Sequence, residues 1–262
     1  MDREADVVYR YDGSFEGFLC CVFESVYAHE IPFAILPHSS PMATLFPEKL
    51  IETDPAKARR VDASLPKKLG KGAHSCVAHA FLSGSEDKEL LILRFRRLGY
   101  RVGPGVMFMA GHKDVAPVLA LEKAVCGEAH LLTGFVRFSE LDGVLVGEIS
   151  PKNRVLPLLR PHFCGRYPQE QFLLYDKTHR EALIHVPGRW SVLPMEEFQM
   201  GRAGQEELQY RRMWRKFYDA IAIQGRENPR CRMTHMPKRY WDNMTEFQRE
   251  EPETGPRAVP SP

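Results

Sequence analysis

The residues that point most directly to chemistry are a mixture of cations and aromatic rings between Gly201 and Trp241. Ten Lys and Arg side chains stand there against four acidic ones, a net charge of +6, whereas the whole chain of 262 residues carries +2. Clustered cations attract phosphate through Coulomb forces and counterion release, and aromatic faces are surfaces on which bases stack. The segment therefore predicts nucleic-acid binding.

A helix is expected over Glu206–Ile223, within this basic segment. Its apolar side chains recur every three or four residues and form one stripe, and its cations fall on the opposite arc. Prolines at 229 and 237 then break the chain into a loop and a short helix near 238–244. The apolar stripe consists of Tyr210, Trp214, Phe217 and Ile221. The predicted nucleic-acid-binding residues are Arg211, Arg212, Arg215, Lys216, Arg226, Arg230, Arg232, Lys238 and Arg239. The alternative interpretation is an ordinary amphipathic helix with a solvated charged face.

A second set of polar residues surrounds two expected hairpins and contains the candidates for acid–base catalysis. These are His130, Arg137 and His162, with Glu128, Glu140 and Arg166 nearby in the sequence. A histidine can exchange protons near neutral pH, and an arginine can hold phosphate. The alternative interpretation is a structural salt-bridge network, because an unpaired guanidinium on a half-buried strand is unfavourable.

The sequence matches no established metal-binding or cofactor-binding motif. Gly70-Lys71 is followed by glycine rather than Ser or Thr, so the phosphate-loop pattern fails, and neither GxSxG nor HExxH occurs. Five soft donors lie in the middle of the chain, but their spacing matches no established zinc site. We therefore expect no metal and no cofactor. The donors are His74, Cys76, His79, Cys126 and His130.

Composition indicates a chain that can bury a sizeable core, since 44% of its residues are hydrophobic. The N-terminus is acidic and resembles no signal peptide, and the longest uncharged run, Ile31–Pro47, is interrupted by prolines. The six cysteines are scattered, which is typical of a reducing compartment. We expect a cytoplasmic protein without a membrane segment.

The hydrophobic pattern predicts an α+β fold with a helical N-terminal half, a mostly antiparallel sheet and the basic C-terminal helix. The sheet is expected from a hairpin over 135–149, turned at Asp142-Gly143, and a second over 172–186 that 189–192 extends. Residues 1–247 are expected to form one domain, with candidate sub-boundaries near 133 and 201. Residues 248–262 are expected to be a disordered tail.

Four ordered blocks of the sequence resemble a known bacterial family. They are YDGSFEGFL, EAHLLTGFVRFSEL, SPKNRVLPLLRPHF with GRYP, and NPRCRMTHMPKRYW. Together they span roughly Val7–Phe247 and are similar to DNA-repair-associated proteins built on domain of unknown function 4130. The resemblance implies DNA metabolism beside a separate radical S-adenosylmethionine (radical SAM) protein. Some relatives are fused to a uracil-DNA glycosylase domain, so such an enzyme is a further candidate partner. We expect no glycosylase activity of this chain.

The resemblance also identifies a set of recurrent polar positions, whose roles stay open. They correspond here to Tyr11, Asp12, His130, Arg137, His162, Asn228, His235, Tyr240 and Trp241. Three classes of function stay open at this point. The first is a nucleic-acid-binding accessory protein that presents DNA to the radical enzyme. The second is a lesion-processing enzyme with His130 or His162 as the acid–base group. The third is a protein adaptor whose aromatic segment binds a partner.

Overall fold

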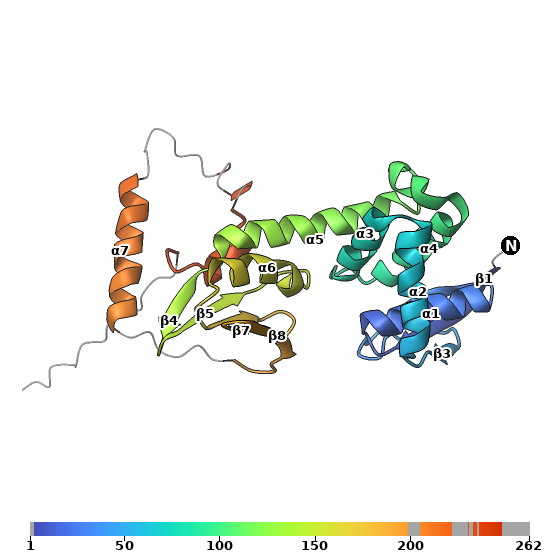
Figure 1. The fold of residues 1–262 in the computed structure, drawn as a ribbon, viewed down its shortest axis with the longest axis horizontal. Helices are drawn as coiled ribbons and strands as arrows, with labels where there is room; N and C mark the ends of the chain where they lie inside the picture. The colour runs from blue at the N-terminus through green and yellow to red at the C-terminus, as the bar shows by residue number, and fades with distance from the viewer. Residues whose placement is uncertain (1–2, 199–204, 222–229, 231–232, 235, 248–262) are drawn as a thin grey trace, which may run out of the picture. The chain divides into compact units, whose positions relative to one another are not determined.

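A computed structural model of the chain describes residues 3–198, 205–221, 230, 233–234 and 236–247 (Figure 1). Two compact units divide the chain. Unit 1 comprises Met1–Ala129 and Lys152–Val155, and unit 2 comprises His130–Pro151 and Leu156–Pro262. Helices and strands are both abundant and largely segregated, so the expected α+β class is confirmed. The single domain over 1–247 stays a prediction.

Unit 1 combines a parallel sheet with helices. The sheet has the strand order β2-β1-β3, and both neighbours run parallel to the central strand. The elements are β1 (Arg3–Tyr11), α1 (Phe15–Tyr27), β2 (Glu30–Pro37), β3 (Glu48–Leu50), α2 (Pro55–Lys68), α3 (Lys71–Phe81), α4 (Lys88–Val102), the 3₁₀ helix η1 (Gly103–Phe108) and α5 (Ala116–Phe135), which continues past the unit boundary.

Local signals explain where the first helices of unit 1 begin. The Ser14 hydroxyl accepts a hydrogen bond from the Gly17 amide at 2.9 Å and caps α1. The Asp54 carboxylate caps α2 in the same way, and Pro55 occupies the first helical position.

The interior of unit 1 holds polar side chains as well as a large apolar core. The Tyr11 hydroxyl donates to the Glu89 carboxylate at 2.7 Å, and both residues are buried. The Arg97 guanidinium donates to Ser25 Oγ and to the carbonyls of Ser25 and Glu30. The buried Arg96 guanidinium is only partly hydrogen-bonded. Its Nη2 donates to a backbone carbonyl, but its Nε and Nη1 lack hydrogen-bond partners. Hydrogen bonding therefore compensates most of this internal polarity.

Unit 2 is built on a five-stranded sheet with the order β4-β5-β6-β7-β8. Every neighbouring pair is antiparallel except β5 and β6, which run parallel and are joined through α6. The elements are β4 (Phe138–Leu141), β5 (Val144–Ile149), α6 (Leu156–Arg166), β6 (Phe172–Asp176), β7 (Glu181–Val186), β8 (Arg189–Pro194), α7 (Gln205–Ile221) and the 3₁₀ helix η3 (Lys238–Asn243).

The first hairpin of unit 2 turns where the sequence predicts. Asp142 and Gly143 both have positive φ, at 50° and 79°, which is the backbone of a type I′ turn. Helix α6 then covers the sheet, and its Phe163 ring meets the ring of Phe138 edge-on at 5.4 Å. Because α6 is a crossover, the β5–β6 pair is parallel although most of the sheet is antiparallel.

The N-terminal half contains a three-stranded sheet beside its helices, and its edge strand β2 was not expected. The expected hinge at 201–204 and the expected tail at 248–262 lie outside the described residues. No helix in the described part of the chain is long and apolar enough to cross a membrane.

Candidate nucleic-acid interface

Helix α7 carries an apolar face that its surroundings leave uncovered. Tyr210, Met213, Trp214 and Phe217 have exposed fractions between 40 and 64%. The rings of Trp214 and Phe217 are stacked, with centroids 5.7 Å apart and planes inclined by 29°. The sequence predicts that such a stripe is buried. Instead it is one of the more exposed apolar surfaces of unit 2.

Polar contacts on another side of α7 hold it to β4. The Arg211 Nε donates to Glu207 Oε1 at 2.7 Å, one turn earlier, and its Nη2 donates to Ser139 Oγ in β4 at 2.6 Å. The Glu140 amide also donates to Glu207 Oε2, at 3.4 Å. Arg211 was expected on the outer face. It faces the sheet instead, because a guanidinium can join a helix carboxylate to a strand hydroxyl.

Two further cations of α7 are exposed, and one of them borders the exposed apolar face. Arg212 and Lys216 are exposed and lie one turn apart. Lys216 is three residues after Met213, so helical spacing places the cation next to the apolar side chains. Arg215 also lies in α7, whereas Arg226 and Arg232 lie outside the described residues.

The 3₁₀ helix η3 exposes two further cations above aromatic rings. The Arg239 guanidinium lies 4.6 Å from the ring centroid of Tyr240 and donates to its hydroxyl, and the Lys238 amine lies 6.0 Å from the ring of Trp241. Trp241 donates from its indole N–H to the Met236 carbonyl at 3.1 Å and is half-buried. Tyr240, at 2% exposure, is the fully packed residue of the two. Arg230 is exposed as well.

Arg137 is used to hold the end of the described chain in place. Its Nη2 donates to Glu246 Oε1 at 2.7 Å, its Nε faces both oxygens of the same carboxylate, and its Nη1 donates to the Gly134 and Val136 carbonyls. The Glu246 side chain is 1% exposed. The guanidinium carbon also lies 5.8 Å from the ring of Trp214. These contacts match the structural salt bridge that the sequence analysis kept as the alternative.

The other two catalytic candidates lie apart from this ion pair. His130 and His162 are exposed, and the His162 ring meets Phe163 edge-on at 4.9 Å. Among the described residues, no hydrogen bond joins His130, Arg137 and His162 to one another. A catalytic group needs a partner or substrate within hydrogen-bond reach. The described residues therefore show no hydrogen-bonded acid–base pair among these three candidates.

A family model for domain of unknown function 4130 matches residues 86–246 of this chain. The chain belongs to this domain family. Comparison with curated proteins and with solved structures found no match. The domain of unknown function 4130 begins inside unit 1, just before α4, and includes the whole described interface of unit 2. The block YDGSFEGFL precedes it.

Several residues that shape the interface of this domain were not singled out from the sequence. Glu207 could have been found, because its spacing of four from Arg211 is typical of an ion pair within a helix. Ser139 and Glu246 have no such local signal, since they meet their arginines across 72 and 109 positions of the chain. Only the tertiary fold brings these partners together.

Proposed function

We propose that this protein is a nucleic-acid-binding accessory protein that takes unpaired bases on the exposed face of α7. The observation that carries the proposal is the exposed aromatic set Tyr210, Trp214 and Phe217, on a helix that also exposes the cations Arg212 and Lys216. Aromatic faces stack on bases and cations neutralise the phosphates that link them. A duplex hides its base faces, so a single-stranded segment is the substrate that suits this surface.

The biological setting of the proposal comes from the resemblance described above. It implies DNA repair or modification beside a separate radical SAM enzyme, with a uracil-DNA glycosylase as a further candidate partner. We propose that the chain presents a DNA strand to that enzyme. The commitment of Arg137 to Glu246 supports a binding role over the alternative of a lesion-processing enzyme.

An adaptor that binds a protein is the second candidate, and the same helix favours it. Met213 contributes to the exposed face of α7 and has no flat surface on which a base could stack. An amphipathic helix with such a stripe can lie in an apolar groove of a partner. The two candidates differ in their response to salt, because phosphate contacts release counterions and apolar contacts do not.

The test is fluorescence anisotropy with a labelled single-stranded oligonucleotide over a series of salt concentrations. We expect dissociation constants in the micromolar range and a steep loss of affinity with salt. Phe217→Ala should remove about 1–3 kcal/mol of binding free energy, a 5- to 150-fold weaker Kd. Replacing Arg212 and Lys216 together by Ala should reduce the salt slope by about 1.4, at roughly 0.7 per phosphate contact on a single strand.

The matched control is Arg189→Ala, which removes an exposed cation of β8 in the same unit and should alter neither affinity nor slope. Binding that persists unchanged in Phe217→Ala would contradict a stacking surface. Absence of oligonucleotide binding, with salt-insensitive capture of the radical SAM enzyme through α7, would favour the adaptor.

A further inference from the structure

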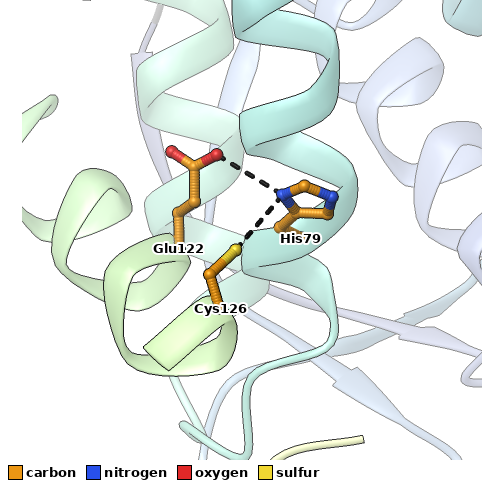
Figure 2. Close-up of side chains that lie close together, drawn as sticks. All are labelled: His79, Glu122 and Cys126. Atoms are coloured by element: carbon orange, nitrogen blue, oxygen red, sulfur yellow. Dashed lines mark hydrogen bonds and ion pairs between the residues drawn. The ribbon is translucent and has the colours of Figure 1, made fainter. Parts of the chain in front are cut away.

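Three metal-ligating side chains of unit 1 converge between α3 and the first half of α5 (Figure 2). His79 comes from the last turn of α3, and Glu122 and Cys126 come from successive turns of α5. His79 Nδ1 lies 3.4 Å from Glu122 Oε1 and 3.5 Å from Cys126 Sγ. All three ligand atoms lie within 4.8 Å of one another.

The packing of the two helices explains why these side chains meet at the rim of the core. Cys76 and Ala80 of α3 and Val118 and Val125 of α5 are fully buried, so both helices turn apolar faces inward. Residues four apart on a helix share a face, which aligns Glu122 with Cys126 beside that core. The side chains of His79 and Glu122 are 31% and 27% exposed, so solvent and ions reach the cluster from one side.

Two of the three separations between the ligand atoms fit a tetrahedral metal ion. Zn²⁺ binds imidazole nitrogen at about 2.0–2.1 Å, carboxylate oxygen at about 2.0–2.2 Å and thiolate sulfur at about 2.3 Å. Tetrahedral angles then put nitrogen and sulfur about 3.5 Å apart and nitrogen and oxygen about 3.4 Å apart. The observed separations of 3.5 and 3.4 Å are close to both edges.

The chemistry of the three donors also suits zinc. A neutral imidazole, a carboxylate and a thiolate together carry two negative charges, which balance one divalent ion. The mixture of nitrogen, sulfur and oxygen is typical of zinc rather than of magnesium or calcium, which prefer oxygen ligands. Three protein ligands leave the fourth tetrahedral position to water on the exposed side.

Cys76 lies one turn before His79 on α3 and is fully buried. It does not belong to the group of three converging ligand atoms. Cys76 is therefore not assigned as a ligand.

We propose that His79, Glu122 and Cys126 bind one zinc ion with an open coordination position. This proposal reverses the expectation of no metal. That expectation arose because the donors lie on two helices and their sequence spacing resembles no known motif. The proposed zinc site uses only residues of unit 1, whereas the proposed nucleic-acid interface uses residues of unit 2. Without an ion, the same three side chains form a cluster joined through the imidazole.

The test is a zinc titration of the full chain after removal of metal by a chelator, in competition with a chromophoric zinc indicator. We expect one zinc per chain. His79→Ala and Cys126→Ser should each weaken binding by more than about 100-fold, since loss of outer hydrogen bonds alone commonly costs 10–100-fold. Substitution with Co²⁺ should give a thiolate charge-transfer absorption that Cys126→Ser abolishes and Cys76→Ser retains.

Two control variants separate ligand loss from damage to the fold. His74→Ala removes a histidine of the same helix that pairs with Asp62, and Cys164→Ser removes a thiol of unit 2. Both should bind zinc like the parent protein, and circular dichroism should show all variants folded. Less than stoichiometric zinc in the parent, or unchanged affinity in His79→Ala and Cys126→Ser, would overturn the site. Loss of zinc in Cys76→Ser would overturn the three-residue ligand set.

Discussion

Unit 1 buries polar side chains, whereas helix α7 of unit 2 exposes apolar ones. Unit 1 places polar groups inside and supplies partners for most of them, as the pair of Tyr11 with Glu89 shows. Helix α7 places aromatic rings outside, where Tyr210 and Phe217 are more than half exposed. A buried polar group is explained by contacts within the molecule. An exposed apolar face calls for contacts with another molecule, so stability and binding should respond to different residues.

The largest expected effect contrasts two tyrosines of unit 2. Tyr240 is 2% exposed and its ring lies 5.6 Å from that of Phe135, whereas Tyr210 is 58% exposed. Tyr240→Ala should reduce the free energy of unfolding by about 3–5 kcal/mol, because it leaves a cavity. Tyr210→Ala should cost less than about 1 kcal/mol. Urea unfolding measures both changes in free energy. Equal losses would contradict the assignment of Tyr240 to the interior and Tyr210 to the surface.

A smaller effect is expected from an arginine pair on α4. Arg97 donates to Ser25 and Glu30 inside unit 1, whereas Arg101, one turn later, is exposed. Arg97→Met keeps much of the packing but leaves buried acceptors unpaired, so we expect a loss of about 2–3 kcal/mol. Arg101→Met should change stability by less than about 0.5 kcal/mol. Similar melting temperatures of the two variants would show that the internal contacts of Arg97 contribute little.

The smallest effect concerns the charge of Glu89 and depends on pH. Burial raises the pKa of Glu89 above its ordinary value, against the opposing effects of Lys88 and the Tyr11 hydroxyl. A raised pKa contributes stability below about pH 4.5 that is lost as the pH rises through the folded-state value. Glu89→Gln does not titrate. Relative to the parent, it should therefore gain stability between pH 4 and pH 7.5.

The measurement for Glu89→Gln is the free energy of unfolding at both pH values. Glu196→Gln is the matched control, because Glu196 is exposed and pairs only with an exposed arginine. It should show the pH dependence of the parent protein. A constant difference between Glu89→Gln and the parent at both pH values would mean that burial does not perturb this carboxyl.

Local structure was the part most accessible from the sequence. The Asp142-Gly143 turn depends on a few adjacent residues and lies where it was predicted. The Ser14 and Asp54 caps are equally local. Strand β2 was missed because Pro32 and Pro37 resemble loop punctuation. Since β2 is an edge strand, it tolerates a proline that a central strand would exclude.

The candidate site was less accessible, because it depends on how elements meet. Helical spacing identified the apolar stripe of α7 but not which side faces β4, and Arg211 consequently turned out to face inward. The same limit applies to His79, Glu122 and Cys126. His79 and Cys126 were among the five soft donors, but only the packing of α3 against α5 brings them together with Glu122. Sequence spacing describes one helix at a time, whereas these clusters need two elements.

The contact between Glu128 and the loop after β5 determines how the chain can be divided. The buried Glu128 carboxylate accepts hydrogen bonds from the amides of Lys152 and Asn153 and from the Asn153 side chain. The chain thus leaves unit 1, forms the first hairpin of unit 2, and returns for four residues before departing again. A fragment that stops at residue 129 would leave the Glu128 carboxylate without these hydrogen-bond donors. A fragment that starts at residue 130 would carry residues 152–155, which belong to unit 1. A protease nick within the hairpin would leave two pieces still joined through Glu128, so no single break in the backbone separates the units.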